Sequence, residues 1–177
     1  MHSEMGLTMI EDVVRELGFL TLGSRLKRIG ERLQAQTQEL LQDAGIEVPA
    51  SHFPLLAALD RLGTLSVGGI SQALGTSQPG VTRQLARLQA LDLVTSGPSP
   101  TDQRQRASAL TKSGRQLVAR AKRSTWPAVE AAVADACGQG GRALLAQLTA
   151  LELALAAAPL RRRSARLRAR GGHHASA

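Results

Sequence analysis

Residues 65–115 read LSVGGISQALGTSQPGVTRQLARLQALDLVTSGPSPTDQRQRASALTKSGR, and this stretch decides the fold. A short helix is predicted over residues 67–74, followed by a turn at Gly75 to Ser77 and a second helix over residues 78–91. Two short helices joined by a tight turn that contains glycine form a helix-turn-helix, whose second helix enters the major groove of DNA. The stretch therefore predicts a helix-turn-helix.

The second of these helices has an apolar and a polar face. Val81, Leu85 and Leu88 follow the i, i+4, i+7 spacing of a buried stripe. Arg83 and Arg87 on the other face could simply be solvated, but their position between a turn and a polar hairpin favours contact with DNA. The polar face and the start of this helix carry Gln78, Pro79, Thr82, Arg83, Ala86 and Arg87.

A polar hairpin follows the second helix. Residues 93–96 and 107–110 are predicted to be antiparallel strands. The loop between them, residues 97–106, is rich in glycine, proline and serine and has Arg104 and Arg106 near its exit. A basic hairpin directly after a helix-turn-helix indicates a wing.

The rest of the chain is predicted to be helical, so the expected fold class is mainly α with a small β-hairpin wing. Apolar spacing and capping signals predict a first helix over residues 8–43, which ends near Gly45, and a second from Phe53 to Leu62, which is capped by Ser51 and ended by Gly63. A third helix is predicted over residues 112–137, capped by Thr111 and bent at Pro127. A last helix is predicted over residues 142–158.

The charge of the chain is unevenly distributed. The 177 residues contain 22 Lys and Arg against 14 Asp and Glu, which gives a net charge of +8. Residues 159–177 hold six arginines and no acid, so residues 1–158 carry only +2. We expect this Arg-rich tail to be flexible. Such a tail can bind DNA phosphates without sequence preference, although a solvated terminus explains it almost equally well.

Several other function classes are disfavoured. Aromatic residues make up 2% of the chain, too few for a surface that stacks single-stranded bases. Cys137 is the single cysteine and His52 the single histidine away from the ends, so no catalytic constellation, metal site or cofactor is expected. No apolar run reaches membrane-spanning length, and we expect a cytoplasmic protein. The turn from Gly75 to Gly80 lacks the lysine of a phosphate-binding loop.

Over about residues 10–155 the chain resembles the MarR family of winged helix-turn-helix transcription regulators. The most specific part of the likeness is the Asp-x-Arg of the wing followed by Leu-Thr-x-x-Gly. The sequence departs from the family pattern at Asp92, where glycine is usual, and at Thr95 and Ser96, which replace a usual arginine. The likeness rests on Leu65–Ser66, Ile70–Gly75, Val81–Arg83, Leu88, Leu93–Val94, Asp102–Arg104 and Leu110–Gly114.

Two segments, Gly18–Arg28 and Phe53–Leu56, are similar to the branch of this family in which the regulator is fused to an acetyltransferase. Because the sequence ends after the regulator, no acetyltransferase is expected.

The resemblance implies a homodimer that binds a pseudo-palindromic duplex site and acts as a repressor or an activator, with possible relief of repression by a small lipophilic or anionic effector. The implied parts are an N-terminal dimerisation helix (1–50), a DNA-binding lobe (51–115), C-terminal dimerisation helices (116–158) and the Arg-rich tail (159–177). The alternative is an architectural protein that binds DNA without sequence preference through the tail.

The resemblance also suggests roles for individual residues. Gln78, Thr82 and Arg83 are candidates to read bases, with Pro79 beside them, and Arg87, Ser66 and Ser77 are candidates to contact phosphates. At the wing, Arg104 and Arg106 would contact the backbone or the minor groove, and Asp102 would orient Arg104. The residues that could line an effector cleft are Arg25, His52, Phe53 and Trp126, although ordinary core packing explains the last two more simply.

Overall fold

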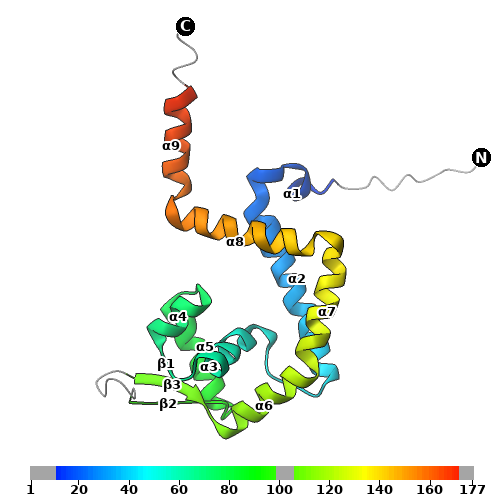
Figure 1. Ribbon diagram of the computed structural model, residues 1–177, viewed down its shortest axis with the longest axis vertical. Coiled ribbons are helices and arrows are strands. Elements are labelled where there is room, and N and C mark those ends of the chain that lie inside the picture. The colour runs from blue at the N-terminus through cyan, green and yellow to red at the C-terminus, as the bar shows by residue number, and fades with distance from the viewer. Residues whose placement is uncertain (1–10, 99–105, 172–177) are drawn as a thin grey trace, which may run out of the picture. The chain divides into compact units, whose positions relative to one another are not determined.

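The structure, a computed structural model, describes residues 11–98 and 106–171 (Figure 1). Contacts divide the chain into two units, Met1–Val129 and Glu130–Ala177. Within the described ranges no single helix is long and apolar enough to cross a membrane. The segments Thr125–Ala157 and Leu160–Ala169 have the length and apolar composition of a membrane span only when they are taken together, and the chain bends by 80° between them.

The first unit begins with a broken helix. In place of the single helix predicted over residues 8–43, the described part contains α1 (Val13–Glu16), the 3-10 turn η1 (Gly18–Thr21) and α2 (Leu22–Asp43). The break occurs because Gly18 adopts a left-handed conformation, with φ at +53°. The carboxylate of Asp12 accepts hydrogen bonds from both terminal nitrogens of Arg28, at 3.0 and 2.9 Å, and so ties α1 to α2.

Three helices form the body of the lobe, α3 (Phe53–Leu62), α4 (Val67–Leu74) and α5 (Gln78–Ala90). The prediction that Ser51 caps α3 is wrong, because a 3-10 turn, η2 (Ala50–His52), occupies this position and leads directly into the helix. Gly63 ends α3 as predicted. The core beneath the three helices contains Leu41, Ile46, Leu55, Leu56, Ile70, Val81, Leu88 and Val118, all almost fully buried.

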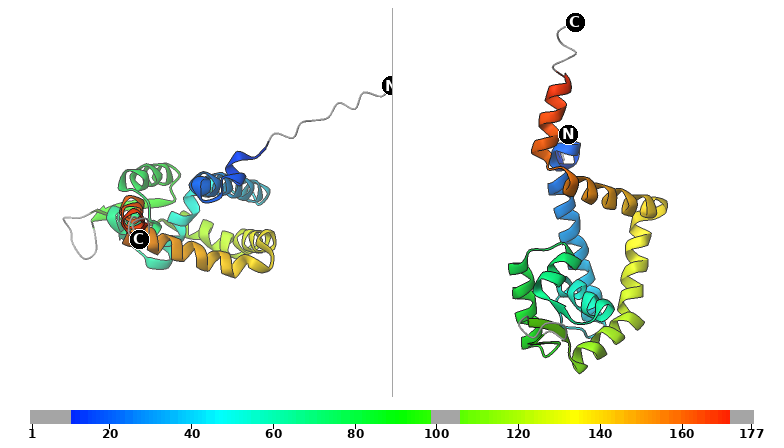
Figure 2. Two further views of the ribbon diagram at one scale, coloured as in Figure 1. Left: turned by 90° about the horizontal axis from the view of Figure 1, so that it is seen from above. Right: turned by 60° about the vertical axis from the view of Figure 1, so that its left-hand side comes forward.

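A small antiparallel sheet lies beside these helices (Figures 1 and 2). Its strands are β1 (Leu65–Ser66), β2 (Val94–Pro98) and β3 (Arg106–Leu110), in the order β1-β3-β2. The hairpin of β2 and β3 matches the prediction, with Val94 opposite Leu110 and Pro98 opposite Arg106. Strand β1 was not predicted from the sequence; it has two residues and pairs with Ala107 and Ser108.

The link from α5 to the sheet depends on a strained residue. Asp92 has φ at +52° and is the single non-glycine residue with positive φ in the described chain. Its carbonyl accepts a hydrogen bond from Thr111 Oγ1 at 2.6 Å, and its carboxylate accepts one from Ser113 Oγ at 3.1 Å. These contacts hold the residue in a conformation for which glycine is better suited.

We predict that Asp92→Gly is more stable than Asp92→Ala by about 1 kcal/mol. Both variants lose the bond to Ser113, but only the alanine variant keeps a side chain that is strained in the left-handed conformation. Urea unfolding of the two variants measures the difference. An alanine variant as stable as the glycine variant would show that the backbone at this position is not strained.

The single bent helix predicted over residues 112–137 is instead two helices, α6 (Lys112–Arg123) and α7 (Thr125–Cys137). The chain breaks at Ser124 and not at Pro127, since a proline ring clashes with the carbonyl four residues earlier. Pro127 therefore lies in the first turn of α7, where its missing N–H costs nothing. Thr111 caps α6 as predicted, accepting a hydrogen bond from Gly114 N at 2.9 Å.

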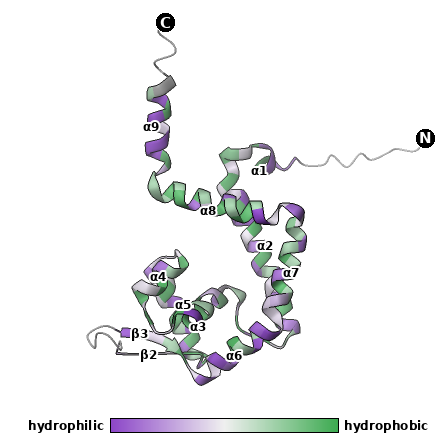
Figure 3. Ribbon diagram, viewed as in Figure 1, coloured by the Kyte–Doolittle hydropathy of each residue, from purple (hydrophilic) through white to green (hydrophobic). Residues whose placement is uncertain are grey.

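The second unit contains the end of α7, a 3-10 turn η3 (Gly138–Gly140), α8 (Gly141–Ala157) and α9 (Leu160–Gly171). The prediction of a flexible tail is wrong for residues 160–171, which form α9. Figure 3 shows that α9 is much more hydrophilic than α8.

Candidate nucleic-acid interface

Three local features position the helix-turn-helix. Ser66 Oγ accepts a hydrogen bond from Gly69 N at 3.1 Å and caps α4. Gly75 ends α4 in the left-handed conformation, with φ at +62°. Ser77 Oγ accepts one from Gly80 N at 3.3 Å and caps α5. These caps satisfy N–H groups at the starts of both helices and fix the turn between them.

Helix α5 is anchored by its apolar face. Val81 and Leu88 are completely buried and Leu85 is 5% exposed, as the spacing predicted. The opposite face and the start of the helix are open to solvent. They carry the predicted contact residues Gln78, Pro79, Thr82, Arg83 and Arg87, all of them exposed.

Neither Arg83 nor Arg87 forms an ion pair with an acid in the described part of the chain. Their charges are therefore available to an external anion or to a guanine edge, which binds arginine in a bidentate way.

The hydroxyl groups differ in what they can still offer a ligand. Ser66 and Ser77 use an oxygen lone pair for capping, which leaves each O–H free to donate to a phosphate. Thr82 already donates its proton to the carbonyl of Gln78, at 3.0 Å. A base that meets Thr82 can therefore use its methyl group or a lone pair.

The wing is attached to α5 by a polar chain that the sequence analysis did not identify. Gln89 Nε2 donates to Ser96 Oγ at 2.7 Å, and Ser96 Oγ lies 2.8 Å from Ser108 Oγ. Gln89 lies seven residues after Thr82, on the same side of the helix, but no local sequence signal indicates its contact with Ser96 of the sheet. A depression of about 230 Å³ lies between α5 and the hairpin, lined by Val67, Thr82, Leu85, Ala86, Gln89, Ser96, Arg106 and Ser108.

Of the three predicted wing residues, one can be placed. Arg106 is exposed at the start of β3 and donates to the carbonyl of Ser96 at 3.4 Å. Asp102 and Arg104 lie outside the described residues.

The four candidate effector residues do not share one site in the first unit. Arg25 lines a depression of about 260 Å³ together with Asp12, Arg15, Arg28, Ile29 and Arg32. Phe53 is buried and meets the half-buried Trp126 edge to face, with ring centroids 6.2 Å apart. His52 precedes Phe53, and burial, together with the charge of Arg87, holds the pKa of its imidazole below the ordinary value.

Comparisons with known proteins agree with this geometry. Residues 46–105 match the MarR family. The transcriptional repressor CouR, solved bound to a 23-mer DNA duplex, is 28% identical, with 74% of this chain and 92% of that chain covered and a TM-score of 0.63. BpsR of Bordetella bronchiseptica, whose DNA binding is regulated by 6-hydroxynicotinic acid, is 25% identical, with 73% and 91% covered and a TM-score of 0.62.

A mutant of E. coli MarR in complex with operator DNA has the same fold. Its TM-score is 0.67 at 19% identity, with 81% of this chain and 99% of that chain covered. None of the curated proteins compared with the chain matches it.

Proposed function

We propose that this chain is a winged helix-turn-helix transcriptional regulator of the MarR family that binds a pseudo-palindromic duplex site as a homodimer and represses transcription there. The observation that carries the proposal is the exposed face of α5, with Gln78, Thr82, Arg83 and Arg87 on a helix anchored by the lobe core. The likeness to the transcriptional repressor CouR, solved bound to a DNA duplex, supports it. The role is regulatory and not enzymatic.

The residues divide into base readers and phosphate contacts. Arg83 is the proposed guanine reader, and Gln78 can pair with adenine. Ser66, Ser77 and Arg87 set the register through phosphates, because the two serine hydroxyls lie at the starts of α4 and α5 and Arg87 lies on the exposed face of α5. At the wing, Arg106 and Arg104, oriented by Asp102, reach the backbone or the minor groove. Pro79 shapes the first turn of α5 beside these groups.

Exposed apolar side chains support a dimer. In the N-terminal helices Phe19 and Leu20 are 95% and 82% exposed. In the second unit Leu145 and Leu153 are 66% and 67% exposed. Apolar surface of this extent is typical of a protein interface. We therefore assign residues 1–50 and 116–158 to dimerisation and residues 51–115 to DNA binding.

An effector that releases DNA is a further part of the proposal, supported by the regulation of BpsR by 6-hydroxynicotinic acid. His52 is one candidate to contact such an effector, and burial, together with the charge of Arg87 on α5, holds the pKa of its imidazole below the ordinary value. Phe53 and Trp126 would act as apolar wall residues. Arg25 belongs to a separate depression and would need a different ligand position.

Two further proposals concern the branch of the family and the cellular location of the protein. We propose, from the likeness of the segments Gly18–Arg28 and Phe53–Leu56, that the chain is related to the branch of the family that includes acetyltransferase fusions. A cytoplasmic location follows from the proposed function, since a regulator must reach the DNA.

Selection of bound sequences from a random duplex library, at near-physiological salt, tests the proposal. Two recognition helices related by a two-fold axis should enrich an inverted repeat with half-sites about one helical turn apart. A protein that binds every duplex equally, with no enriched repeat, would instead support the alternative of an architectural protein driven by the Arg-rich tail.

A further inference from the structure

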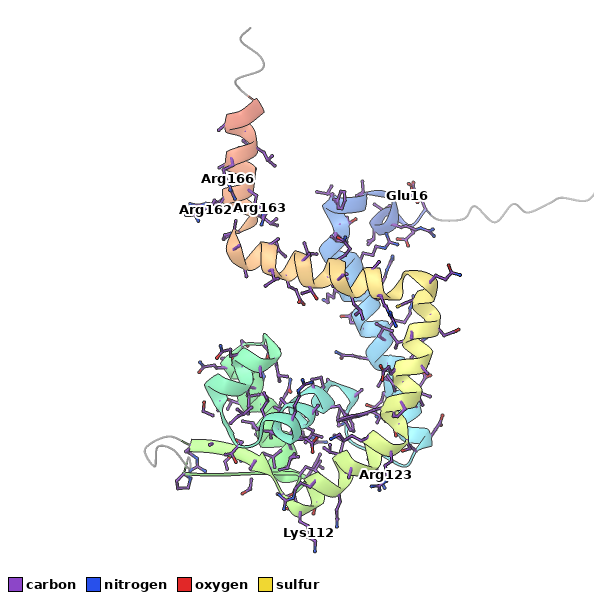
Figure 4. The ribbon with its side chains drawn as sticks, viewed as in Figure 1. Glu16, Lys112, Arg123, Arg162, Arg163 and Arg166 are labelled. Carbon is purple, nitrogen blue, oxygen red and sulfur yellow. The ribbon has the colours of Figure 1, made fainter. Side chains whose placement is uncertain are left out.

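The Arg-rich segment is an ordered element with a fixed start. Arg163 Nε donates to the carbonyl of Ala158 at 2.9 Å, and its terminal nitrogen donates to the carbonyl of Ala154. Arg163 thus caps the end of α8 and sets the direction in which α9 leaves it. Figure 4 labels Arg163 with its neighbours Arg162 and Arg166 on α9.

Four other arginines of α9 make no such contact with the end of α8 among the described residues. Arg161, Arg162, Arg166 and Arg168 are all exposed, and none forms an ion pair within the described residues. Residues 160–171 contain no acid, so no pairing along this helix is available.

The charges also oppose the helix in the free protein. Arg162 and Arg166 are four residues apart and repel each other. Arg161, Arg162 and Arg163 lie in the first turn, where the positive end of the helix dipole disfavours cations. A polyanion alongside α9 would relieve both penalties.

We propose that α9 is a second DNA-binding element that contacts the duplex phosphates without reading sequence. Its 12 residues span about 18 Å, and a duplex carries one negative charge per about 1.7 Å of its axis. Because α5 and α9 belong to one chain, a duplex held by α5 is present at high local concentration for α9.

A membrane surface fits α9 less well. Its large apolar residues are Leu160 and Leu167, which are 69% and 67% exposed. Helices that lie in a membrane interface bury a larger apolar face than two side chains provide. The inference rests on the proposed DNA-binding function and adds to it a phosphate-contacting surface outside the lobe.

The test replaces Arg161, Arg162, Arg166 and Arg168 of the full chain with glutamine, which keeps helix propensity and leaves the Arg163 cap intact. Anisotropy of a labelled duplex of scrambled sequence gives the affinity between about 50 and 200 mM KCl. Each phosphate contact contributes about 0.9 to the slope of log affinity against log salt, so we expect the slope to decrease by about 3.6 per protomer.

A matched control removes four exposed charges elsewhere, Arg32, Arg61, Arg123 and Arg142, each replaced by glutamine. The control should change the slope much less than the α9 variant. An equal decrease in both variants, or no decrease in the α9 variant, overturns the inference. Loss of binding to phosphatidylserine vesicles with an unchanged DNA slope also overturns it and assigns α9 to membranes.

The ratio of affinities for a selected repeat and a scrambled duplex separates this inference from the proposed function. The α9 variant should keep the ratio of the unmodified chain, because loss of phosphate contacts weakens both complexes alike. If the unmodified chain selects a repeat and the α9 slope does not change, only this inference fails. If the unmodified chain selects no repeat, the proposed function fails.

Discussion

Replacing Arg83 and Arg87 together with alanine is expected to abolish specific DNA binding while leaving the protein folded. Arg83 supplies the proposed guanine contact, and loss of a bidentate contact of this kind costs about 1–3 kcal/mol. With the phosphate contact of Arg87 also removed, affinity for a selected repeat should fall by about 100- to 1,000-fold. Anisotropy titration of the repeat at fixed salt measures the loss.

The fold should survive because both side chains are exposed and neither is part of the core. The matched control is Arg61→Ala with Arg123→Ala, two exposed arginines on α3 and α6. The control should retain most of the affinity. Unchanged affinity of the Arg83 and Arg87 variant for the repeat would contradict the assignment of α5 as the recognition helix.

Among alanine substitutions at the glycines of the described residues, Gly114→Ala should cause the largest loss of stability. A Cβ at this position would lie 2.0 Å from the carbonyl oxygen of Leu93 and 3.0 Å from its carbonyl carbon. Both are backbone atoms, so the start of α6 and the start of the hairpin would have to separate. We expect a decrease of about 3 kcal/mol in the free energy of unfolding, measured by urea denaturation.

Gly69→Ala is the matched control. Gly69 occupies the same third position of its helix and also donates its N–H to a capping hydroxyl. Its added Cβ would meet Leu65 and Ser66 at 3.5 Å, which is ordinary contact. Stability of this variant should be unchanged or higher by up to about 1 kcal/mol. Equal effects of the two substitutions would show that the close approach at Gly114 is not what requires glycine.

Features determined by a few neighbouring residues were predictable from the sequence. The hydroxyl cap Thr111 occurs where the pattern indicated, and the exposed face of α5 follows from its apolar stripe. The departure from the family pattern at Asp92 also marked a real feature, since this residue has positive φ.

Features that depend on distant partners were not predictable in this way. Strand β1 has two residues and exists because it pairs with β3, about 40 residues later in the chain. The bond between Gln89 and Ser96 requires the sheet to be in place before it can form. The Arg-rich composition of residues 159–177 predicts a flexible tail, but arginine and alanine also have high helix propensity, and residues 160–171 form helix α9.

A repeat of the library selection with the single variant Arg83→Ala tests most directly whether α5 reads bases. If Arg83 reads guanine, preference should disappear at one symmetry-related position in each half-site and persist at the other positions. An unchanged preference at every position would contradict base reading by Arg83 and would require another element to provide the specificity.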